Sequence, residues 1–584
     1  MQVSALHFQT ALLVGGALFC PTAAGRQIAG ADVFNGALRP AYTPEWSAVP
    51  ALRTLELAFD PGLSDVENGQ RLKDRLETMT AGDTLLVGAG RWSVNSFFQV
   101  DLQGTPTAPI RVVGQPGAVL TRPNAGQNVI NFGSTTDTST RYLLLRGFRV
   151  EGGSYGIRIQ NSESLWIDQC VIQGAANAGV GANSHDTDQL TVTRCEVYDT
   201  GGTGEGLYLG GNNGSFICSR AVVALNHIHD TGGSQGDGIE LKQGSWGCLI
   251  AENVIHDTPY PGILVYGTDG NPINVIEANV VWNTGTNPFQ IQGEALVRNN
   301  LIFSNVGPAL QSGPHQAGTN ELKVIGNTFF TRDDQAAFLR SWGGKSGMML
   351  VNNVFYSETG QSVHVNGGLD GVTVASNVVL GPVWGVASSV VTAGFTQGRG
   401  LEDFVDVTWS GSRRDARPTG MSALNRTPFS LSSGEWRFDL TGAVRTAGSH
   451  VGALEPGTYG RYMGRSTRNA PRLRTRFPLQ TGAASYTIQV EDVEPFTSVY
   501  VSAQLLDAVT GGPASPGAGS GAGSNAPALP PVQIRGTLAD ASGRATISLD
   551  ADELPGAGER LLLRAATRSP AGRERARRLL LIAR

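Results

Sequence analysis

A phrase of alternating apolar and polar residues recurs through the middle of the chain, between about residues 140 and 380. Its copies are separated by 21 to 31 residues, and they include LTVTRCEVYDT, VVALNHIHDT, LIAENVIHDT and LVRNNLIFSN. Each period holds short strands and Gly- or Asn-rich bends, which is too little chain for a strand–helix–strand crossover. Fixed periods of this length are typical of solenoids. We therefore predict a coil in which each strand pairs in parallel with its equivalent one turn on, roughly 4.8 Å away.

Alignment of the copies brings one position into a single column. Asparagine tolerates left-handed backbone, and its amide can bond its equivalents above and below, so we predict an inward ladder at one bend. The first two members are cysteines, which we expect to be buried thiols although their spacing allows a disulfide. The sequence leaves the pairing of the four cysteines from Cys170 onward open. The column is Cys170, Cys195, Asn226, Asn253, Asn279, Asn300, Asn327, Asn353 and Asn377, and the cysteines outside it are Cys218 and Cys248.

The repeat resembles that of right-handed parallel β-helix proteins over most of residues 81–400. The resemblance implies an all-β fold with capped ends, because an open solenoid exposes unpaired strand edges. Residues 438–457 resemble the closing segment of many secreted β-helices. We predict a right-handed parallel β-helix over 81–457, preceded by an N-terminal segment and a capping helix over 25–80.

The capping helix has its own sequence signals. Leu72, Leu76 and Met79 fall on one face of the predicted helix. We expect that face to pack against the first turn of the coil. Ser64 and Glu67 have the spacing of a capping box at the start of the helix.

The composition changes after residue 457. Alternating strands such as SYTIQVE and RATISLD predict a small β-sandwich over 458–584, and the Gly/Ser/Pro-rich stretch 511–531 predicts a disordered loop. This tail has a formal charge of +6, so the rest of the chain carries −11 and the whole chain −5. The mild net charge gives no sign of nucleic-acid binding.

Residues 1–24 have the apolar core ALLVGGALF followed by small residues, which is typical of a secretory signal peptide. No later apolar run reaches the roughly 18 residues that a membrane helix needs. We expect a protein that is secreted, extracellular or periplasmic, without a transmembrane segment, and monomeric.

A second phrase lies between the copies of the first, and its alternate residues should line an outer wall. Glu205 and Asp237 precede its strands on adjacent turns, so they should lie about one rung apart. The predicted outward columns are Arg158, Gly181, Tyr208, Glu240, Leu264, Gln290 and, two positions on, Gln160, Asn183, Gly210, Lys242, Tyr266, Gln292.

The residues clustered on this wall suit β-elimination in a polyuronide. That reaction needs the sugar carboxylate neutralised, a base for the C5 proton and an acid for the leaving oxygen. Paired carboxylates can hold Ca²⁺, and a lysine in its neutral form can serve as a base, whereas arginine stays protonated. The chain has four lysines among 44 Lys and Arg residues, so Lys242 on this wall is especially informative.

The segment DGIELK, residues 237–242, resembles the strand that carries the catalytic lysine in β-helix polysaccharide lyases of the pectate, alginate and dermatan types. In those families an acidic residue five positions before the lysine helps to bind calcium. The resemblance implies Lys242 as base and an acidic polysaccharide as substrate. A tyrosine stands where some members have arginine. The remaining assignments are Tyr266 or Tyr208 as acid, Glu205, Asp237 and Glu240 as calcium ligands, and Trp246, Gln290, Gln292 and Arg340 as substrate contacts.

Other interpretations remain open. Lys242 can be a solubilising residue paired with Glu240, and the protein can be a non-catalytic glycan-binding solenoid or a uronan C5-epimerase. His229 and His256 stack at equivalent positions and can bind a metal, although a stacked aromatic column with neighbouring aspartates ordering the turns is favoured. His315, on a Gly-rich loop, is a further but weakly supported candidate.

Overall fold

The computed structural model describes residues 40–134 and 139–431, the stretches 436–441, 445 and 450–456, and beyond these only the backbone of strands between residues 472 and 582. The predicted signal peptide and the predicted loop 511–531 lie outside the described residues. The chain divides into two compact units, residues 1–464 and residues 465–584. No helix in the described part of the chain is long and apolar enough to cross a membrane.

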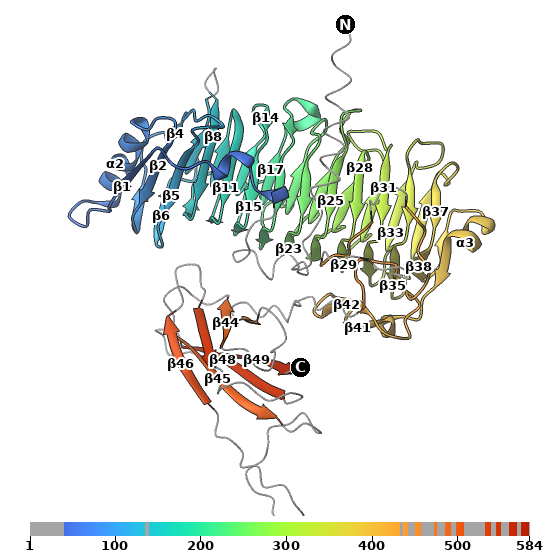
Figure 1. Cartoon of the computed structure of the whole chain (residues 1–584). Coiled ribbons are helices and arrows are strands. Elements are labelled where there is room, and N and C mark those ends of the chain that lie inside the picture. Colours follow the sequence, from blue (N-terminus) through green and yellow to red (C-terminus); the bar gives the residue numbers. More distant parts are fainter. Residues whose placement is uncertain are drawn as a thin grey trace, which may run out of the picture. The chain divides into compact units, whose positions relative to one another are not determined.

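The first unit is a coil whose turns stack three parallel sheets (Figure 1). Sheet A follows the order β1 (Arg53–Leu57), β2 (Asp83–Val87), β5 (Ile110–Gly114), β8 (Thr140–Arg146), β11 (Ser162–Asp168), β15 (Thr191–Thr193), β19 (Val222–Ala224), β22 (Leu249–Ala251), β25 (Asn274–Glu277), β28 (Ala295–Arg298), β31 (Leu322–Ile325), β34 (Met349–Val351) and β37 (Thr373–Ala375), with β14 (Thr187–Asp188) and β18 (Cys218–Ser219) beside it.

Sheet B contains the strands that continue the first repeated phrase. Its order is β3 (Gly90–Ser93), β6 (Ala118–Arg122), β9 (Arg149–Gly152), β12 (Val171–Gln173), β16 (Glu196–Tyr198), β20 (His227–His229), β23 (Val254–Thr258), β26 (Val280–Thr284), β29 (Leu301–Ser304), β32 (Thr328–Thr331), β35 (Val354–Ser357), β38 (Asn377–Leu380) and β40 (Phe395–Gln397).

Sheet C contains the second repeated phrase. Its order is β4 (Gln99–Val100), β7 (Ile130–Phe132), β10 (Ile157–Ile159), β13 (Val180–Ala182), β17 (Leu207–Leu209), β21 (Ile239–Leu241), β24 (Ile263–Val265), β27 (Phe289–Ile291), β30 (Leu310–Ser312), β33 (Ala337–Arg340), β36 (Val363–Asn366) and β39 (Val383–Trp384). The predicted parallel β-helix is therefore confirmed, and a continuous apolar core from Leu57 to Phe395 fills it.

The asparagine ladder at the bend between sheets A and B is also confirmed. The backbone N–H and side-chain amide of Asn253 both donate to Oδ1 of Asn279 at 3.0 Å, and the pattern repeats along the coil to Asn377. The left-handed backbone belongs to the preceding residues instead, for example Leu225 and Ala278. The prediction that asparagine is used for its own left-handed conformation is wrong, because what the bend needs is its amide.

The four described cysteines are buried free thiols. Cys195 occupies the ladder as predicted, and its backbone N–H donates to Oδ1 of Asn226 at 2.9 Å. Burial, together with hydrogen bonding from Cys170, raises the pKa of the Cys195 thiol.

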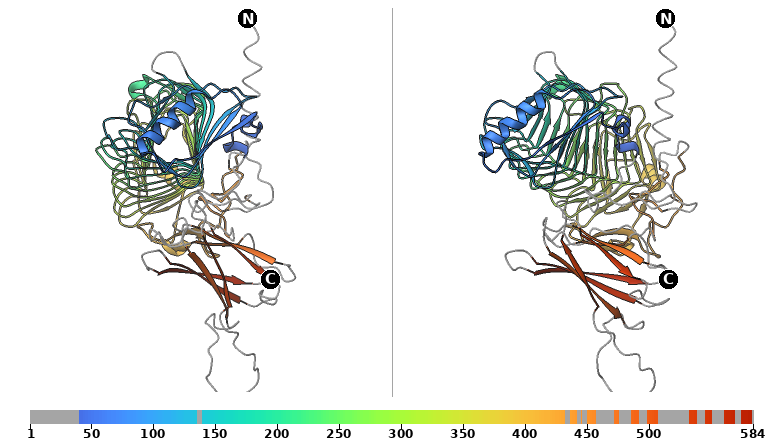
Figure 2. Two further views of the ribbon diagram at one scale, coloured as in Figure 1. Left: turned by 90° about the vertical axis from the view of Figure 1, so that its left-hand side faces the viewer. Right: turned by 60° about the vertical axis from the view of Figure 1, so that its left-hand side comes forward.

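Helix α2 (Asp65–Glu77) lies across the N-terminal end of the coil (Figure 2). Ser64 caps it, and Ser64 and Glu67 form both hydrogen bonds of the predicted capping box. Leu72, Leu76 and Met79 are buried in the core of the coil. The predicted cap is confirmed, and it covers the first rung.

Segments outside the coil cover parts of its outer faces. The short helices η1 (Pro40–Tyr42) and η2 (Glu45–Ala48) lie on sheet A, where Trp46 packs against Trp166 at 6.2 Å between ring centroids. After β40, the antiparallel pair β41 (Phe404–Val407) and β42 (Arg414–Pro418) packs on sheet B, where Phe404 contacts Phe330. The other short helices are η3 (Asn212–Gly214), α3 (Ser388–Gly394) and η4 (Leu401–Asp403).

The second unit consists of antiparallel strands, in keeping with the predicted sandwich. One sheet contains β43 (Arg472–Thr475), β44 (Ser485–Glu491) and β47 (Ala545–Asp550), and the other contains β46 (Val532–Leu538), β45 (Ser498–Leu506), β48 (Arg560–Arg568) and β49 (Glu574–Ile582).

Candidate active site

The strand register of sheet C places the predicted columns as expected. Tyr208 pairs with Glu240, Glu240 with Leu264, and Leu264 with Gln290. Lys242 follows β21, and its backbone N–H donates to the carbonyl of Leu209 at 2.8 Å. One alternating pattern, repeated at each turn, therefore aligns side chains that lie 24 to 32 residues apart in sequence.

Lys242 is the centre of this cluster. Its Nζ forms an ion pair with Oε1 of Glu240, and both side chains are buried, with 5% and 3% exposed. The ammonium also lies 5.0 Å from the ring centroid of Tyr208 and 5.2 Å from that of Tyr266. Lys242 thus lies between side chains from the turns on both sides. Its burial argues against a solubilising role, whereas the ion pair with Glu240 that the alternative interpretation predicted is present.

Two further carboxylates precede the strands on adjacent turns. The backbone N–H of Gly206 donates to the carbonyl of Asp237 at 2.8 Å, so Glu205 and Asp237 lie one rung apart as predicted. Thr203 donates to Oε2 of Glu205 at 2.7 Å. One oxygen of each of three carboxylates is buried without a hydrogen-bond partner, namely Oε1 of Glu205, Oδ1 of Asp237 and Oε2 of Glu240.

The electrostatics of the cluster follow from this burial. Burial raises the pKa of Glu205, of Glu240 and, most strongly, of Asp237, and the repulsion among the carboxylates adds to the rise for Glu205 and Asp237. Burial and the neighbouring carboxylates also raise the pKa of Tyr208 and Tyr266, so both phenols stay protonated. The site consequently favours a proton or a cation beside its acidic groups.

The donor chemistry fits calcium, since Ca²⁺ prefers carboxylate oxygens and three such oxygens are unpartnered. The distances among the carboxylate oxygens on sheet C are longer than a shared ion needs. Within the described residues, the set that brings its ligand atoms within 4.8 Å of one another is Glu196, His227 and His229 on sheet B. The carboxylates on sheet C would have to turn toward one another to share an ion.

The outer wall at this point is covered, although the alternating pattern alone predicts an exposed one. Tyr208 donates to Oδ1 of Asn212 at 3.2 Å, which ties it to the loop at η3. The His315 ring lies 6.0 Å from that of Tyr266, and Ala317 packs against Leu264 and Tyr266. These loops, which follow β17 and β30, therefore pack against Tyr208 and Tyr266.

Comparison with known proteins agrees with the fold. The family model described as "right handed beta helix region" matches residues 124–274 and 237–396. This part of the chain is a right-handed β-helix. No curated protein matches the chain.

Several solved structures are similar to this β-helix at low identity. An alginate lyase from Paenibacillus sp. str. FPU-7 is 17% identical over 57% of this chain and 99% of its own, with a TM-score of 0.34. The pectate lyase Pel9A is 15% identical over 70% of this chain and 98% of its own, with a TM-score of 0.39. The A-module of a mannuronan C-5 epimerase from Azotobacter vinelandii is 13% identical over 58% of this chain and 94% of its own, with a TM-score of 0.34.

The predicted substrate contacts are more scattered on the β-helix than the predicted cluster. Gln290 and Gln292 lie on the turn after Tyr266, and Gln292 is buried with Oε1 unpartnered. Arg340 ends β33 further along sheet C and packs beside Gly313. Trp246 lies instead near the edge of sheet A, where Arg220 is 5.9 Å from its ring, so the structure does not bring it to Lys242.

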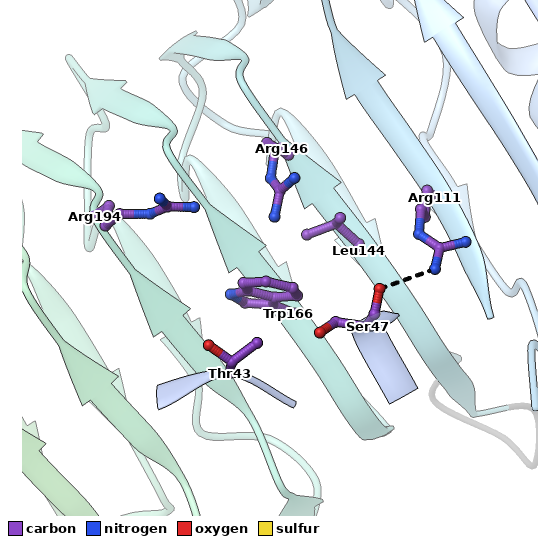
Figure 3. A pocket seen from close by; sticks show the side chains of 7 residues that line it. All are labelled: Thr43, Ser47, Arg111, Leu144, Arg146, Trp166 and Arg194. Carbon is purple, nitrogen blue, oxygen red and sulfur yellow. Dashed lines mark hydrogen bonds between the residues drawn. The ribbon is translucent and has the colours of Figure 1, made fainter. Parts of the chain in front are cut away.

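A cavity of about 300 Å³ lies on sheet A beneath the N-terminal segment, and the predicted cluster does not line it (Figure 3). Its arginines are engaged. Arg111 donates to the carbonyl of Ser47 at 3.2 Å, while Arg146 and Arg194 both bind Asp168. The arginines therefore join the N-terminal segment and successive rungs.

On sheet B, the predicted aromatic column is confirmed. Tyr198, His229, His256 and Trp282 stack with centroid separations of 5.0, 5.2 and 4.3 Å. Sequence reasoning missed Glu196 and His227, which pair in the neighbouring column. The signal was present, because each of the two directly follows a residue of the ladder column.

Proposed function

We propose that this protein is a polysaccharide lyase that cleaves an acidic, uronate-containing polysaccharide by β-elimination at the Lys242 cluster. The observation that carries the proposal is the convergence of Lys242 with two protonated tyrosines and three carboxylates that keep unpartnered oxygens. A lysine, a phenol and a carboxylate cluster supply the base, the acid and the charge neutralisation that this reaction requires.

The residues divide the proton transfers among them. Lys242 gives its ammonium proton to its ion-pair partner Glu240, and the neutral amine then removes the C5 proton. The C4–C5 double bond forms as the bond from C4 to the leaving oxygen breaks. Tyr266 or Tyr208 donates its phenolic proton to that oxygen, and both are positioned against Lys242.

Calcium belongs to the proposal as an ion that Glu205 and Asp237 would hold, with Glu240 as a third ligand while its carboxylate is ionised. A bound Ca²⁺ supplies charge that neutralises the sugar carboxylate and makes the C5 proton more acidic. The need for such a cation is strengthened by the formal charge of −11 before the tail, since that charge repels a polyanionic substrate. Export of the protein through the predicted signal peptide is part of the same proposal.

Substrate access requires the covering loop to move. Lys242 and Tyr266 are buried, and the loop carrying His315 and Ala317 lies against Tyr266. We expect this loop to open as the polysaccharide binds along sheet C. The bound polysaccharide then excludes water from the site during the reaction.

The experiment is a panel of polyuronides incubated with the purified protein, with and without EDTA, and followed by ultraviolet absorption of the unsaturated uronate. We expect product from at least one substrate with the wild type and the Lys345→Ala control, and loss of product with Lys242→Ala. Lys345 is an exposed lysine distant in sequence from the cluster, so it controls for charge. Equal activity of Lys242→Ala and wild type would remove the assignment.

A C5-epimerase is the second candidate, because Tyr208 and Tyr266 flank Lys242 from opposite turns and one of them can return a proton to C5. An epimerase incorporates solvent deuterium at C5 and inverts the sugar without producing an unsaturated residue. Binding of a polyuronide with neither product would favour a non-catalytic glycan-binding protein.

A further inference from the structure

A second cluster of ionisable side chains lies on sheet B, on three successive rungs. Glu196 pairs with His227 in one column, and His229 pairs with His256 in the next. Oε1 of Glu196 lies 3.2 Å from Nε2 of His229 and 3.6 Å from Nδ1 of His227. One ligand atom from each of these three residues lies within 4.8 Å of the other two.

These separations match the edges of a small coordination polyhedron. Metal–nitrogen and metal–oxygen distances of about 2.0–2.2 Å in a tetrahedral site place neighbouring ligand atoms roughly 3.3 Å apart. The two measured separations, 3.2 and 3.6 Å, lie on either side of that value.

The hydrogen bonds around the cluster fix where the ring protons lie. Nδ1 of His229 lies 2.7 Å from Oδ2 of Asp230, and Nδ1 of His256 lies 2.7 Å from Oδ2 of Asp257. Since a carboxylate only accepts, both Nδ1 atoms carry a proton, and Nε2 of the neutral His256 ring carries a lone pair. Nε2 of His229 lies against a second carboxylate, that of Glu196, so it carries a proton as well. Nε2 of His227 lies 2.8 Å from Nε2 of His256, so His227 donates there and its Nδ1 also carries a lone pair.

Oε1 of Glu196, Nδ1 of His227 and Nε2 of His229 therefore face one another, with one proton between Glu196 and His229. A divalent cation that binds all three atoms takes the place of that proton.

The supporting contacts are those that metal-binding histidines use. A ligating imidazole donates its other N–H to a carboxylate or another acceptor, which fixes the ring and raises its basicity. His229 does so to Asp230, and His227 does so to His256, which in turn donates to Asp257. His256 is held in place by its stack on Trp282, over which Arg414 lies at 3.8 Å.

The cluster is open on one side. The side chains of Glu196, His227 and His229 are 29%, 24% and 13% exposed, so an ion can reach them from solvent. Three protein ligands leave one tetrahedral position for water or another ligand, as in catalytic rather than structural zinc sites.

We propose that Glu196, His227 and His229 form a binding site for a divalent transition-metal ion of the Zn²⁺ class. Two imidazoles and one carboxylate select such an ion over calcium, which prefers oxygen ligands throughout. The site lies on a different sheet from the Lys242 cluster and does not depend on the proposed lyase activity.

The test uses the full chain, stripped with EDTA, dialysed, and titrated calorimetrically with ZnCl₂ in the presence of excess CaCl₂. We expect one equivalent of Zn²⁺ to bind, and we expect CoCl₂ to give the intense visible absorption of a low-coordinate Co²⁺ site. The His227→Gln/His229→Gln variant should lose affinity by at least about 100-fold.

His364→Gln is the matched control, because His364 is a partly buried histidine on sheet C between Phe338 and Trp384. It should bind Zn²⁺ as the wild type does, and circular dichroism should show that both variants are folded. A wild type that binds no Zn²⁺ in the titration would overturn the proposal and would assign a shared proton to the cluster. Equal binding by wild type and the double variant would also overturn it.

Discussion

The Lys242 cluster on sheet C and the histidine cluster on sheet B are built by the same rule and differ in their cover. Both arise because equivalent positions on successive turns stack at the spacing of paired strands. The side chains of Lys242 and Glu240 are buried, whereas those of Glu196, His227 and His229 are partly exposed. The degree of burial therefore decides which kind of chemistry a stacked column of side chains can perform.

The carboxylates show this difference most clearly. On sheet C, burial raises the pKa of Glu240. On sheet B, burial opposes ionisation in the same way, but the contacts with His227 and His229 prevail and lower the pKa of Glu196. Burial and the neighbouring His229 hold the pKa of His227 down at about 3, so its ring stays neutral, whereas contacts with Glu196 and Asp230 outweigh burial and raise the pKa of His229.

The largest expected effect separates the two clusters by activity. Tyr266→Phe or Tyr208→Phe should lower turnover of the polyuronide by about 10²- to 10⁴-fold, whichever phenol protonates the leaving oxygen. Neither change should alter Zn²⁺ affinity, since both rings lie on sheet C. The rates of unsaturated-product formation check the first expectation, and loss in neither variant would contradict the proposed acid.

The same substitution in both clusters should have unequal effects on stability. Glu240→Gln leaves Lys242 as a buried ammonium without its ion-pair partner, so we expect unfolding to become easier by about 3 kcal/mol. Glu196 is partly exposed, so Glu196→Gln should change the stability of the metal-free protein by less than about 1 kcal/mol. Urea unfolding in the presence of EDTA measures the unfolding free energy of both variants. Equal losses of stability in the two variants would contradict the difference in burial between the two clusters.

A supporting residue of the sheet B cluster should matter without being a ligand. Asp230→Asn removes the carboxylate that orients His229, and we expect Zn²⁺ affinity to fall by about 10- to 100-fold. Asp186→Asn, a change of the same type on the exposed loop before β14, is the control and should leave affinity unchanged. An unchanged Zn²⁺ affinity in Asp230→Asn would contradict a supporting role for the contact between His229 and Asp230.

The smallest effect is a dependence of stability on pH. Asp237 has a folded-state pKa raised well above 3.8, so its contribution to stability is present at low pH and is lost as the pH rises above about 4 toward the folded value. In EDTA, Asp237→Asn should therefore gain stability relative to wild type as the pH is raised from 4 to 8. Unfolding midpoints of both proteins across this range measure the difference in stability. A stability of Asp237→Asn that falls relative to wild type as the pH rises would contradict the expectation.

The sequence predicted the register because one alternating pattern repeats at every turn. The columns through Tyr208, Glu240 and Leu264, and the ladder from Asn226 onward, follow directly from the aligned copies. The capping helix was also predictable, since Ser64 and Glu67 are a local signal. These features depend on neighbours that are close in sequence or on a strict period.

The cover could not be predicted because it depends on loops that interrupt the period. Nothing in the alternation indicates that Ala317 packs on Tyr266, or that Arg414 returns to Trp282 from beyond the last turn. The position of Trp246 could not be predicted for the same reason, because the turn that carries it leads toward sheet A. The cluster of Glu196, His227 and His229 was accessible to alignment, but its supporting contacts to Asp230 and Asp257 required the folded structure.

The central claim is that Lys242 acts as the base, and Lys242→Arg tests it most directly. Arginine preserves the positive charge beside Glu240 but stays protonated, so it can replace the structural role of the lysine and not its proton transfer. With the polyuronide that the wild type cleaves, we predict that Lys242→Arg is folded and forms no unsaturated product, while Lys345→Arg is fully active. Product formation by Lys242→Arg at the wild-type rate would contradict the account.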